Sequence, residues 1–309
     1  MVQFIPRFSN ATPTVHNLLE NRMGIIWELD FYSRPVLDER NKKQWEVLIC
    51  ESPLRIDQPP DDLFRYSQFC SNTEVNSVWL RQALEEAIAQ AAAPPDRIRF
   101  FRRQMTNMIT KACEDAGIPA YPSRRTVALN QWLQTRMDQV YPAMPNYKPS
   151  ANPSVNLGDS MPQRLPDALV GQQWTLVTLE ASAFADFPDW AVDFGEVFSF
   201  PLLDLPPDTR IPGVLIFSPR ALPLAAWMSG LELAFVKALP SKPPVLALET
   251  GASESWILAN LTTDTLNTEA QNFERAKQKA QGVHFLATQT DADADAFTGF
   301  WLMQELNLA

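Results

Sequence analysis

The chain has 309 residues, of which 46% are hydrophobic and 20% are charged, and its formal net charge at pH 7 is −10. Its length corresponds to about two domains of roughly 100–200 residues each. This composition excludes a wholly disordered chain, because such chains lack the apolar mass that offsets the entropy lost on folding. The longest apolar stretches, residues 212–217 and 223–228, are much shorter than the roughly 20 residues of a membrane-spanning helix. We therefore expect no membrane insertion.

Several common catalytic signatures are missing from the sequence. His16 and His284 are the only histidines, which excludes His-rich metal sites and argues against a Ser-His-Asp triad. Cys50, Cys70 and Cys113 lie far apart and form no CxxC pair, so neither a disulfide framework nor a zinc ribbon fits, and a reducing compartment is favoured. Neither GxGxxG nor GxxxxGK[ST] occurs. We therefore expect no metal ion and no cofactor.

The charges are unevenly distributed along the chain. Residues 1–96 carry a net charge of −5 and residues 149–309 a net charge of −11. Between them, residues 97–148 hold nine Lys or Arg and three Asp or Glu, a net charge of +6. This basic segment between two acidic regions is a weak indication of an acidic partner, nucleic acid included.

The first half of the sequence alternates predicted strands and helices. Residues 1–22 show little periodicity and no apolar signal region, so we interpret them as a tail or extension before an ordered domain that begins at Met23. The first two predicted strands alternate apolar with polar residues and are joined by a short polar turn, which predicts a hairpin. The predicted elements are strand 24–33, strand 43–51, a connection over 52–73, helix 76–93, strand 97–104, helix 106–116, an extended segment 118–121 and helix 123–141.

A proline-rich segment separates this half from the second. Residues 142–171 contain six prolines together with Asn, Ser and Gly, a composition typical of an interdomain linker. The expected organisation is a tail or extension over 1–22, an N-terminal domain over 23–141, a linker over 142–171 and a C-terminal domain over 172–309.

The second half is also predicted to mix strands and helices. Its order of strand, helix, strand and helix from Trp256 matches the order from Trp45 in the first half. We predict a mixed α/β (α+β) fold of two modules related by a loose internal duplication, with chance recurrence of this common order as the alternative. The predicted elements are strands 173–180, 197–203 and 213–218, helix 221–238, a hairpin of strands 245–249 and 255–261, helix 268–281, strand 283–288 and helix 293–306.

A ten-residue string near the N-terminus is long and unusual. It reads IWELDFYSRP at Ile26–Pro35 and is followed by WEVLICE at Trp45–Glu51. Together with SWILA at Ser255–Ala259, these strings make residues 23–309 resemble the Tab family of cyanobacteria and chloroplasts. Where that family commonly has Trp-Leu-Leu near its C-terminus, this chain has Trp301-Leu302-Met303. The residues that carry the resemblance are Trp27, Glu28, Asp30, Tyr32, Arg34, Trp256, Trp301 and Leu302.

The resemblance implies a function in photosystem biogenesis. Members of the Tab family are RNA-binding factors named for activating translation of the photosystem I reaction-centre subunit PsaB. A non-enzymatic protein is therefore implied, whose partners are the mRNA 5′ untranslated region of a photosystem message and photosystem assembly proteins. Chloroplast members carry a transit peptide. Because this chain shows no Arg/Ser-rich, acid-poor leader, a cyanobacterial, cytoplasmic protein is implied, with its plastid relatives in the chloroplast stroma.

The basic segment supplies the candidate RNA-binding residues. Arginine offers forks for phosphate and planes for base stacking, and aromatic rings offer stacking platforms. In the alternative interpretation, Ile98 and Phe100 face the core while the arginines pair with the acidic helix 76–93. We expect replacement of Arg102 and Arg103 by Glu to weaken RNA binding without unfolding the protein. The candidates are Arg97, Arg99, Phe101, Arg102, Arg103, Arg124 and Arg125.

Three carboxylates on the predicted hairpin suggest a second hypothesis. Glu28, Asp30 and Glu46 could hold Mg²⁺ and cleave a phosphodiester, as the acids of PD-(D/E)xK nucleases do on a pair of strands. That pattern requires Lys two residues after the second-strand acid, where this chain has Leu48. In the structural alternative, which we favour, Arg34 or Lys43 pairs with Asp30 or Glu46 across the hairpin. A third hypothesis is a photosystem assembly factor that binds proteins through its acidic second domain.

The remaining notable residues are expected to be structural. Trp27, Trp45, Trp256 and Trp301 are interpreted as core tryptophans, with Trp301 on a helical stripe that packs onto the second domain. Cys50 is expected to be a buried thiol and His284 a histidine with satisfied hydrogen bonds. We interpret Asp291, Asp293 and Asp295 as a solvated cluster at the start of a helix.

Overall fold

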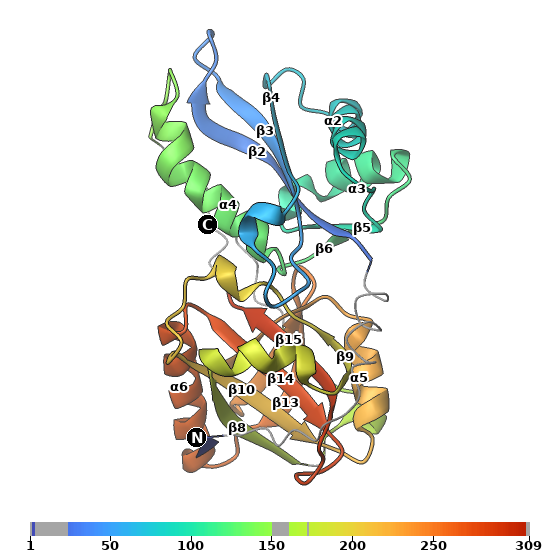
Figure 1. The fold of residues 1–309 in the computed structure, drawn as a ribbon, viewed down its shortest axis with the longest axis vertical. Coiled ribbons are helices and arrows are strands. Elements are labelled where there is room, and N and C mark those ends of the chain that lie inside the picture. The colour runs from blue at the N-terminus through green and yellow to red at the C-terminus, as the bar shows by residue number, and fades with distance from the viewer. Residues whose placement is uncertain (1, 4–23, 150–160, 172, 307–309) are drawn as a thin grey trace. The chain divides into compact units, whose positions relative to one another are not determined.

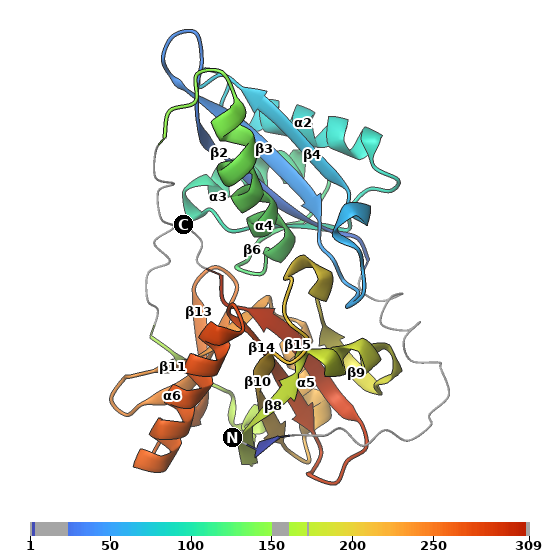
Figure 2. The same cartoon turned by 60° about the vertical axis from the view of Figure 1, so that its left-hand side comes forward.

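The computed structural model describes residues 2–3, 24–149, 161–171 and 173–306. Its contacts divide the chain into two compact units, each of which mixes helices and strands (Figures 1 and 2). In the described part, the N-terminal unit comprises residues 24–53, 60–149 and 306. The C-terminal unit comprises residues 2–3, 54–59, 161–171 and 173–305. Most of the expected tail over 1–22, and part of the expected linker, lie outside the described residues.

The N-terminal unit is built on one five-stranded sheet with the order β4-β3-β2-β5-β6. The first three strands along the chain pair antiparallel, whereas β5 joins β2 and β6 joins β5 in parallel. Helices α2 and α3 cover one face of this sheet and α4 lies on the other (Figure 1). The elements are β2 (Ile26–Leu37), β3 (Lys43–Glu51), β4 (Arg65–Cys70), α2 (Ser77–Gln90), β5 (Arg97–Phe100), α3 (Thr106–Asp115), β6 (Ala120–Pro122) and α4 (Val127–Thr135).

Strand β2 is buried on both faces, but the two faces differ in chemistry. Trp27, Leu29 and Phe31 belong to the apolar core shared with α2 and α3. Because side chains alternate along a strand, Glu28 and Asp30 point to the opposite face, beneath α4. Both carboxylates are almost fully buried, at 1% and 0% exposure. A buried charge requires partners, so this second face of the sheet is where a specific polar arrangement is found.

The C-terminal unit contains two sheets. A six-stranded sheet has the order β1-β8-β10-β14-β15-β9, and a four-stranded sheet has the order β11-β12-β13-β7. The core includes Val214, Phe273, Leu286 and Trp301 and is closed by α5 and α6. The elements are β1 (Val2–Gln3), β7 (Gln163–Arg164), β8 (Gln173–Glu180), β9 (Val192–Glu196), β10 (Arg210–Phe217), α5 (Ala221–Ser229), β11 (Leu233–Leu239), β12 (Val245–Thr250), β13 (Glu254–Asn260), α6 (Asp264–Lys279), β14 (Val283–Gln289) and β15 (Phe297–Gln304).

Several predicted elements are confirmed and others are wrong. The strand predicted over 43–51 is β3 residue for residue, and the two predicted hairpins are antiparallel pairs. The predicted connection over 52–73 contains strand β4, which was missed because its residues Arg65–Cys70 have little apolar alternation. The helix predicted over 123–141 is α-helical only from Val127 to Thr135 and then continues as a π-helix, Arg136–Val140.

Three predictions in the second half are wrong. The helix predicted over 221–238 ends at Ser229, and Leu233–Leu239 forms β11 because its apolar run pairs with β12. The strand predicted over 197–203 is a loop with a short 3-10 helix, Phe200–Leu202. The helix predicted over 293–306 is instead strand β15, which is paired on both sides, with β14 and β9. The second half therefore lacks the final helix on which the suggested duplication depended.

Candidate functional site

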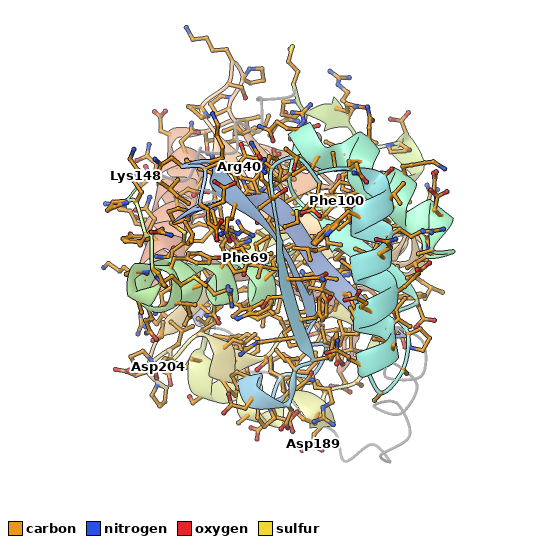
Figure 3. All side chains as sticks on the ribbon, turned by 90° about the horizontal axis from the view of Figure 1, so that it is seen from above. Arg40, Phe69, Phe100, Lys148, Asp189 and Asp204 are labelled. Carbon is orange, nitrogen blue, oxygen red and sulfur yellow. The ribbon has the colours of Figure 1, made fainter. Side chains whose placement is uncertain are left out.

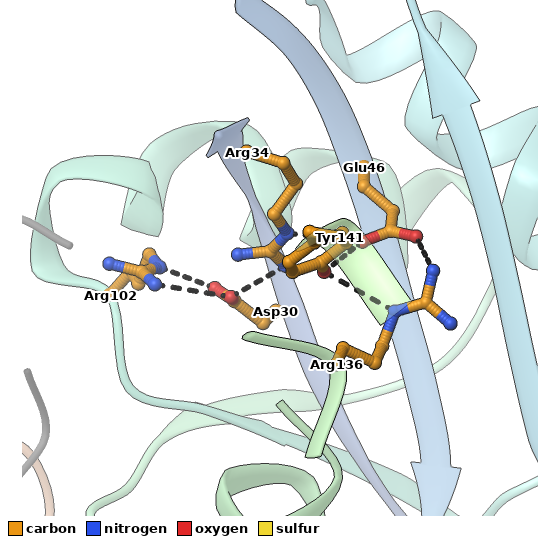
Figure 4. Close-up of polar contacts among 6 residues, drawn as sticks. All are labelled: Asp30, Arg34, Glu46, Arg102, Arg136 and Tyr141. Carbon is orange, nitrogen blue, oxygen red and sulfur yellow. Dashed lines mark hydrogen bonds and ion pairs between the residues drawn. The ribbon is translucent and has the colours of Figure 1, made fainter. Parts of the chain in front are cut away.

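Six polar side chains meet beneath α4 in the N-terminal unit and form a charge cluster (Figure 4). Asp30 and Arg34 come from β2, and Glu46 comes from the neighbouring strand β3. Arg102 comes from the chain just after β5, and the π-helix after α4 positions Arg136 and Tyr141. The members of this charge cluster are Asp30, Arg34, Glu46, Arg102, Arg136 and Tyr141.

Arg34 lies at the centre of the charge cluster and contacts both carboxylates. Its Nη2 donates to Asp30 Oδ2 at 2.9 Å and its Nε donates to Glu46 Oε2 at 3.1 Å. Arg102 donates to the other side of Asp30, with Nε 2.5 Å from Oδ1 and Nη2 3.2 Å from Oδ2. The prediction that Arg34 pairs with Asp30 or Glu46 is confirmed, and Arg34 pairs with both.

The second end of the charge cluster is organised by the π-helix. Arg136 Nη2 and the Tyr141 hydroxyl both donate to the Glu46 carboxylate, and Arg136 Nε donates to the Tyr141 oxygen at 3.3 Å. The wider π turn places residues five apart on the same side, which brings Arg136 and Tyr141 together on Glu46. All four of the interacting oxygens on Asp30 and Glu46 therefore accept from a cation or a hydroxyl.

The electrostatics of the charge cluster favour ionised groups despite their burial. Burial by itself raises the pKa of Asp30, but Arg102 and Arg34 outweigh it and hold that pKa below its usual value. Burial lowers the pKa of Arg34, whereas Asp30, Tyr141 and Glu46 raise it, with a net increase. Burial also raises the pKa of Tyr141, so its phenol stays protonated and acts as a donor. Three guanidinium groups thus face two carboxylates.

Glu28 occupies a separate position on the same face, at the start of α4. It accepts a hydrogen bond from Ser52 Oγ at 2.6 Å and another from the backbone N of Leu129 at 2.8 Å. Leu129 is the third residue of α4, so Glu28 satisfies one of the N–H groups that the helix itself cannot pair. Burial raises the pKa of Glu28 to about 7, against the opposing effects of Ser52, Leu129, Arg99 and Arg125.

The arrangement gives the three candidate carboxylates structural partners. Glu28 anchors α4, and Asp30 and Glu46 are held by arginines. Within the part of the chain that the structure describes, no group of three or more His, Cys, Asp or Glu side chains is arranged to hold a metal ion. The geometry thus fits a rigid scaffold that fixes β2, β3 and α4 relative to one another.

The structure distributes the predicted RNA-binding residues between interior and surface. Ile98 and Phe100 belong to the core, as the alternative interpretation predicted. The described partner of Arg102 is Asp30, however, and not the acidic helix. Arg103 is exposed and Arg97 is half-buried. The buried members are Arg99, Phe101, Arg102, Arg124 and Arg125.

The burial of Arg102 also corrects one expected experiment. Its guanidinium lies 4.0 Å from the centre of the Tyr32 ring and is ion-paired with Asp30. Glutamate at this position would place a second carboxylate against Asp30 in the interior, so the replacement of Arg102 is not a surface test. Replacement of Arg103, which is exposed, is still a test of the surface.

Three residues on the α4 side of the sheet were not identified from the sequence. Trp132 on α4 has Arg65 and Arg136 near its ring, at 5.8 Å and 5.5 Å from the ring centre. The spacing of four between Trp132 and Arg136 on a predicted helix was an available signal. Arg65 lies on β4, the strand that the sequence did not reveal.

Most of the residues that we expected to be structural are so. Cys50 is fully buried, and burial raises the pKa of its thiol well above the usual value. His284 is buried, where Nε2 accepts from the backbone N of Val236 and Nδ1 donates to the Gly282 oxygen, each at 2.8 Å. Trp301 packs in the C-terminal core, although from a strand. Asp291, Asp293 and Asp295 are exposed, but they precede β15 and start no helix.

The remaining tryptophans of the resemblance differ in burial. Trp27 is 1% exposed and lies in the core, where it stacks on Phe64 with ring centres 5.1 Å apart. Trp45 and Trp256 are only half-buried and pack at the margins of the two cores. Leu302 is fully buried in β15. None of these positions offers a fully exposed ring.

Comparison with known proteins gives the chain a family. Residues 26–136 match the N-terminal domain of the family described as RNA-binding protein Tab2/Atab2, and residues 152–304 match its C-terminal domain. The chain belongs to the Tab2/Atab2 family. It is 39% identical over 288 residues to a chloroplastic TAB2 homolog of Arabidopsis thaliana, covering 91% of this chain and 74% of that protein. A chloroplastic TAB2 homolog of Zea mays is 38% identical over 287 residues, covering 91% and 71%.

The Tab2/Atab2 match locates the charge cluster within the family's N-terminal domain. Residues 26–136 include every member except Tyr141, which lies beyond the matched segment.

No described helix combines the length and the apolar character that crossing a membrane requires. The mixed α/β fold predicted from the sequence is confirmed in both units.

Proposed function

We propose that this protein is a non-enzymatic RNA-binding factor that promotes translation of photosystem messages and thereby photosystem biogenesis. The observation that carries the proposal is the match of both halves to a family described as RNA-binding. The identity of 39% over 91% of the chain to a chloroplastic relative supports placement in a photosynthetic organism. The mRNA 5′ untranslated region, photosystem assembly partners and a cyanobacterial cytoplasm are the finer parts of this proposal.

The charge cluster supports a binding role over a catalytic one. A carboxylate that activates water or holds Mg²⁺ has to present oxygens to them. Asp30 and Glu46 instead accept from arginines and from Tyr141, and Glu28 is bonded to Ser52 and to the start of α4. No observation favours the nuclease hypothesis, and the protein contributes a fixed surface rather than reacting groups.

Accessible cations near the start of the basic segment are the proposed RNA contacts. Arg103 is exposed and follows β5, and Arg97 is half-buried at the start of β5. Tyr121 on the neighbouring strand β6 has 45% of its surface exposed and offers an aromatic ring. This combination provides phosphate contacts and a stacking platform at one edge of the sheet. The domain limits of 23–141 and 172–309 likewise remain a prediction.

Crosslinking in living cells tests this function. The protein is crosslinked to RNA in a photosynthetic cell and the bound RNA is sequenced. We expect enrichment of one or a few photosystem messages, with a lower yield for R103E. The matched control is R81E, which reverses a charge on α2, where Arg81 pairs with Glu85 at 3.6 Å. RNA at background level in the wild type would contradict the proposal and direct attention to protein partners.

A further inference from the structure

An aromatic ring flanked by two cations lies on the α4 side of the N-terminal unit. Trp132 is half-buried on α4, and the guanidinium carbons of Arg65 and Arg136 lie 5.8 Å and 5.5 Å from its ring centre. Both distances fall within the range of a cation–π contact. The two arginines come from elements that are far apart in the sequence, so the fold assembles this arrangement.

Strand β4 continues the same surface with a second aromatic ring. Tyr66 and Cys70 belong to the core on the α2 side, so the alternate residues Arg65 and Phe69 face the α4 side. Phe69, which is labelled in Figure 3, is half-buried. It pairs in register with Glu46, the residue that holds Arg136. We name the surface made by Arg65, Phe69, Trp132 and Arg136 the α4–β4 surface.

The two cations of the α4–β4 surface differ in how firmly they are held. Arg136 is fixed by Glu46 and Tyr141 in the charge cluster, and 11% of its side chain is exposed. Arg65 is exposed, and its described hydrogen bond is a 3.3 Å contact to the Pro60 oxygen. One guanidinium is therefore preorganised beside Trp132, while the other is free to turn around an incoming group.

The position at a sheet edge adds hydrogen-bonding capacity. Strand β4 is the first strand in the order β4-β3-β2-β5-β6, so among the described residues β3 is its one partner in the sheet. The N–H and C=O groups along its outer edge pair with no described strand and can bond to a ligand that lies along β4. The opposite edge of the sheet is β6, so this surface is distinct from the proposed contacts around Arg103.

A single-stranded nucleic acid matches these chemical features. Unpaired bases stack on aromatic rings and on guanidinium planes, and arginine forks also bind phosphate. In a duplex the base faces are already stacked and cannot reach Trp132 or Phe69. Glu46, the carboxylate beside the surface, is neutralised by Arg34 and Arg136, so it does not repel phosphate.

We propose that the α4–β4 surface binds unpaired bases of single-stranded RNA, with Trp132 and Phe69 as stacking platforms and Arg65 as the adjustable cation. This inference rests on the proposed function, because it assigns a site to the RNA that function requires. These residues are not among the candidates of the basic segment, and the family match names no residues. Arg136 acts as a positioning group that holds one side of Trp132.

Binding of a labelled RNA to the full-length protein tests the site. The probe is a 20-nucleotide oligouridylate, compared with an RNA duplex of the same length, and binding is followed by fluorescence anisotropy. We expect the double variant R65Q/W132L to bind the single strand about tenfold more weakly or worse, since one stacked base is worth roughly that factor. W132F should stay within about threefold of the wild type because it keeps a ring.

Matched controls separate the site from general effects. R81Q removes a charge on the other face of the same sheet, and W227L removes a half-buried tryptophan in the C-terminal unit. Neither should change the affinity for the single strand. Thermal unfolding verifies that each variant is folded. The exposed change R65Q does not disturb the core and should alone weaken binding about threefold.

Photocrosslinking of the wild type provides a measurement that needs no variant. We expect adducts on peptides that carry Trp132 or Phe69. Adducts confined to other peptides, or a folded R65Q/W132L that binds the single strand as tightly as the wild type, would overturn the site and leave the proposed function standing. Wild-type protein with no affinity for any RNA would overturn both and would leave this surface to a protein partner.

Discussion

Asp30 is a buried carboxylate of the charge cluster that pairs with two arginines. It is fully buried and contacts the guanidinium groups of Arg34 and Arg102. Asp30→Asn keeps the shape but removes the carboxylate that Arg102 pairs with and one of the two that Arg34 pairs with, which costs about 3–5 kcal/mol. Urea unfolding should show this loss. The control Asp115→Asn removes the exposed pair with Lys111 and should change stability by less than about 0.5 kcal/mol. Equal effects of the two changes would contradict the prediction.

Glu28 should make stability depend on pH. Burial raises its pKa from 4.5 to about 7, so between these values the folded protein binds the proton more tightly than the unfolded chain does. The stabilisation is therefore full below pH 4.5 and is lost as the pH rises through about 7. Glu28→Gln removes the titration, and the wild type should lose about 3 kcal/mol relative to this variant across that window.

Urea midpoints for both proteins at several values between pH 4.5 and pH 8 provide the measurement. Gln still accepts from the backbone N of Leu129 and still reaches Ser52, so the start of α4 stays anchored in the variant. The control Glu85→Gln changes an exposed carboxylate and should run parallel to the wild type at every pH. Parallel profiles for Glu28→Gln as well would show that Glu28 is ionised throughout.

The sequence predicted residue contacts only where the chain is locally regular. The pairing of Arg34 with the hairpin carboxylates follows from alternation on two adjacent strands, and it is confirmed. The burial of Arg102 does not follow, because Asp30 lies 72 residues away and reaches it only through the parallel pairing of β2 with β5. A run of arginines in a sequence predicts an exposed basic surface. An arginine of such a run can nevertheless be buried where the fold places a carboxylate beside it.

At the scale of one element, the start of α2 depends on a cap. The side-chain oxygen of Asn76 accepts from the backbone N of Trp79 at 2.9 Å, and Asn76 itself is extended. Asn76→Ala should therefore cost about 1 kcal/mol of stability, whereas Asn76→Ser should keep most of it. Denaturant unfolding measures the difference. A loss of equal size for both changes would indicate that the contact with Trp79 is not what stabilises the helix.

The type of an element could be predicted where the apolar periodicity and the capping residues indicate the same structure. It could not be predicted where pairing with strands distant in the sequence determines the structure. Helix α2 has a cap, a proline stop and a regular apolar stripe, so its limits are nearly those predicted. Strand β15 has the spacing of a helical stripe at Phe297, Phe300, Trp301 and Gln304, yet it is a strand because β14 and β9 pair with it on either side. Tertiary pairing thus overrides local pattern, as it does at β11.

At the scale of the whole molecule, positive and negative charges are separated along the chain, but only some of the charged side chains lie at the surface. Residues 97–148 have a net charge of +6, and residues 149–309 have a net charge of −11. The two-part organisation and the charge distribution could be taken from the sequence. The number of solvent-accessible cations could not be taken from the sequence, because several arginines are buried in the fold. The arginines of the basic segment that are buried are Arg99, Arg102, Arg124 and Arg125.

This separation leads to a prediction about salt. Binding of a single strand weakens with a slope of about −0.7 in log–log form for each phosphate contact. If all nine cations of the basic segment touched phosphate, the slope would be about −6. The accessible cations predict about three to five contacts and a slope of about −2 to −3.5. These cations are Arg97, Arg103, Lys111 and Lys148 of the basic segment, together with Arg65 on β4.

Titration of a 20-nucleotide single-stranded RNA at salt concentrations between about 50 and 300 mM KCl measures the slope. Over this range the Debye length falls from about 14 Å to about 6 Å, so the screening of exposed charges changes strongly. Arg103→Gln should make it shallower by about 0.7, since one phosphate contact is lost. Arg81→Gln, on the α2 side, should leave it unchanged. A wild-type slope near −6 would contradict the prediction. Such a slope would require the buried arginines to leave Asp30 and Glu28 when RNA binds, and the charge cluster would then be a switch rather than a scaffold.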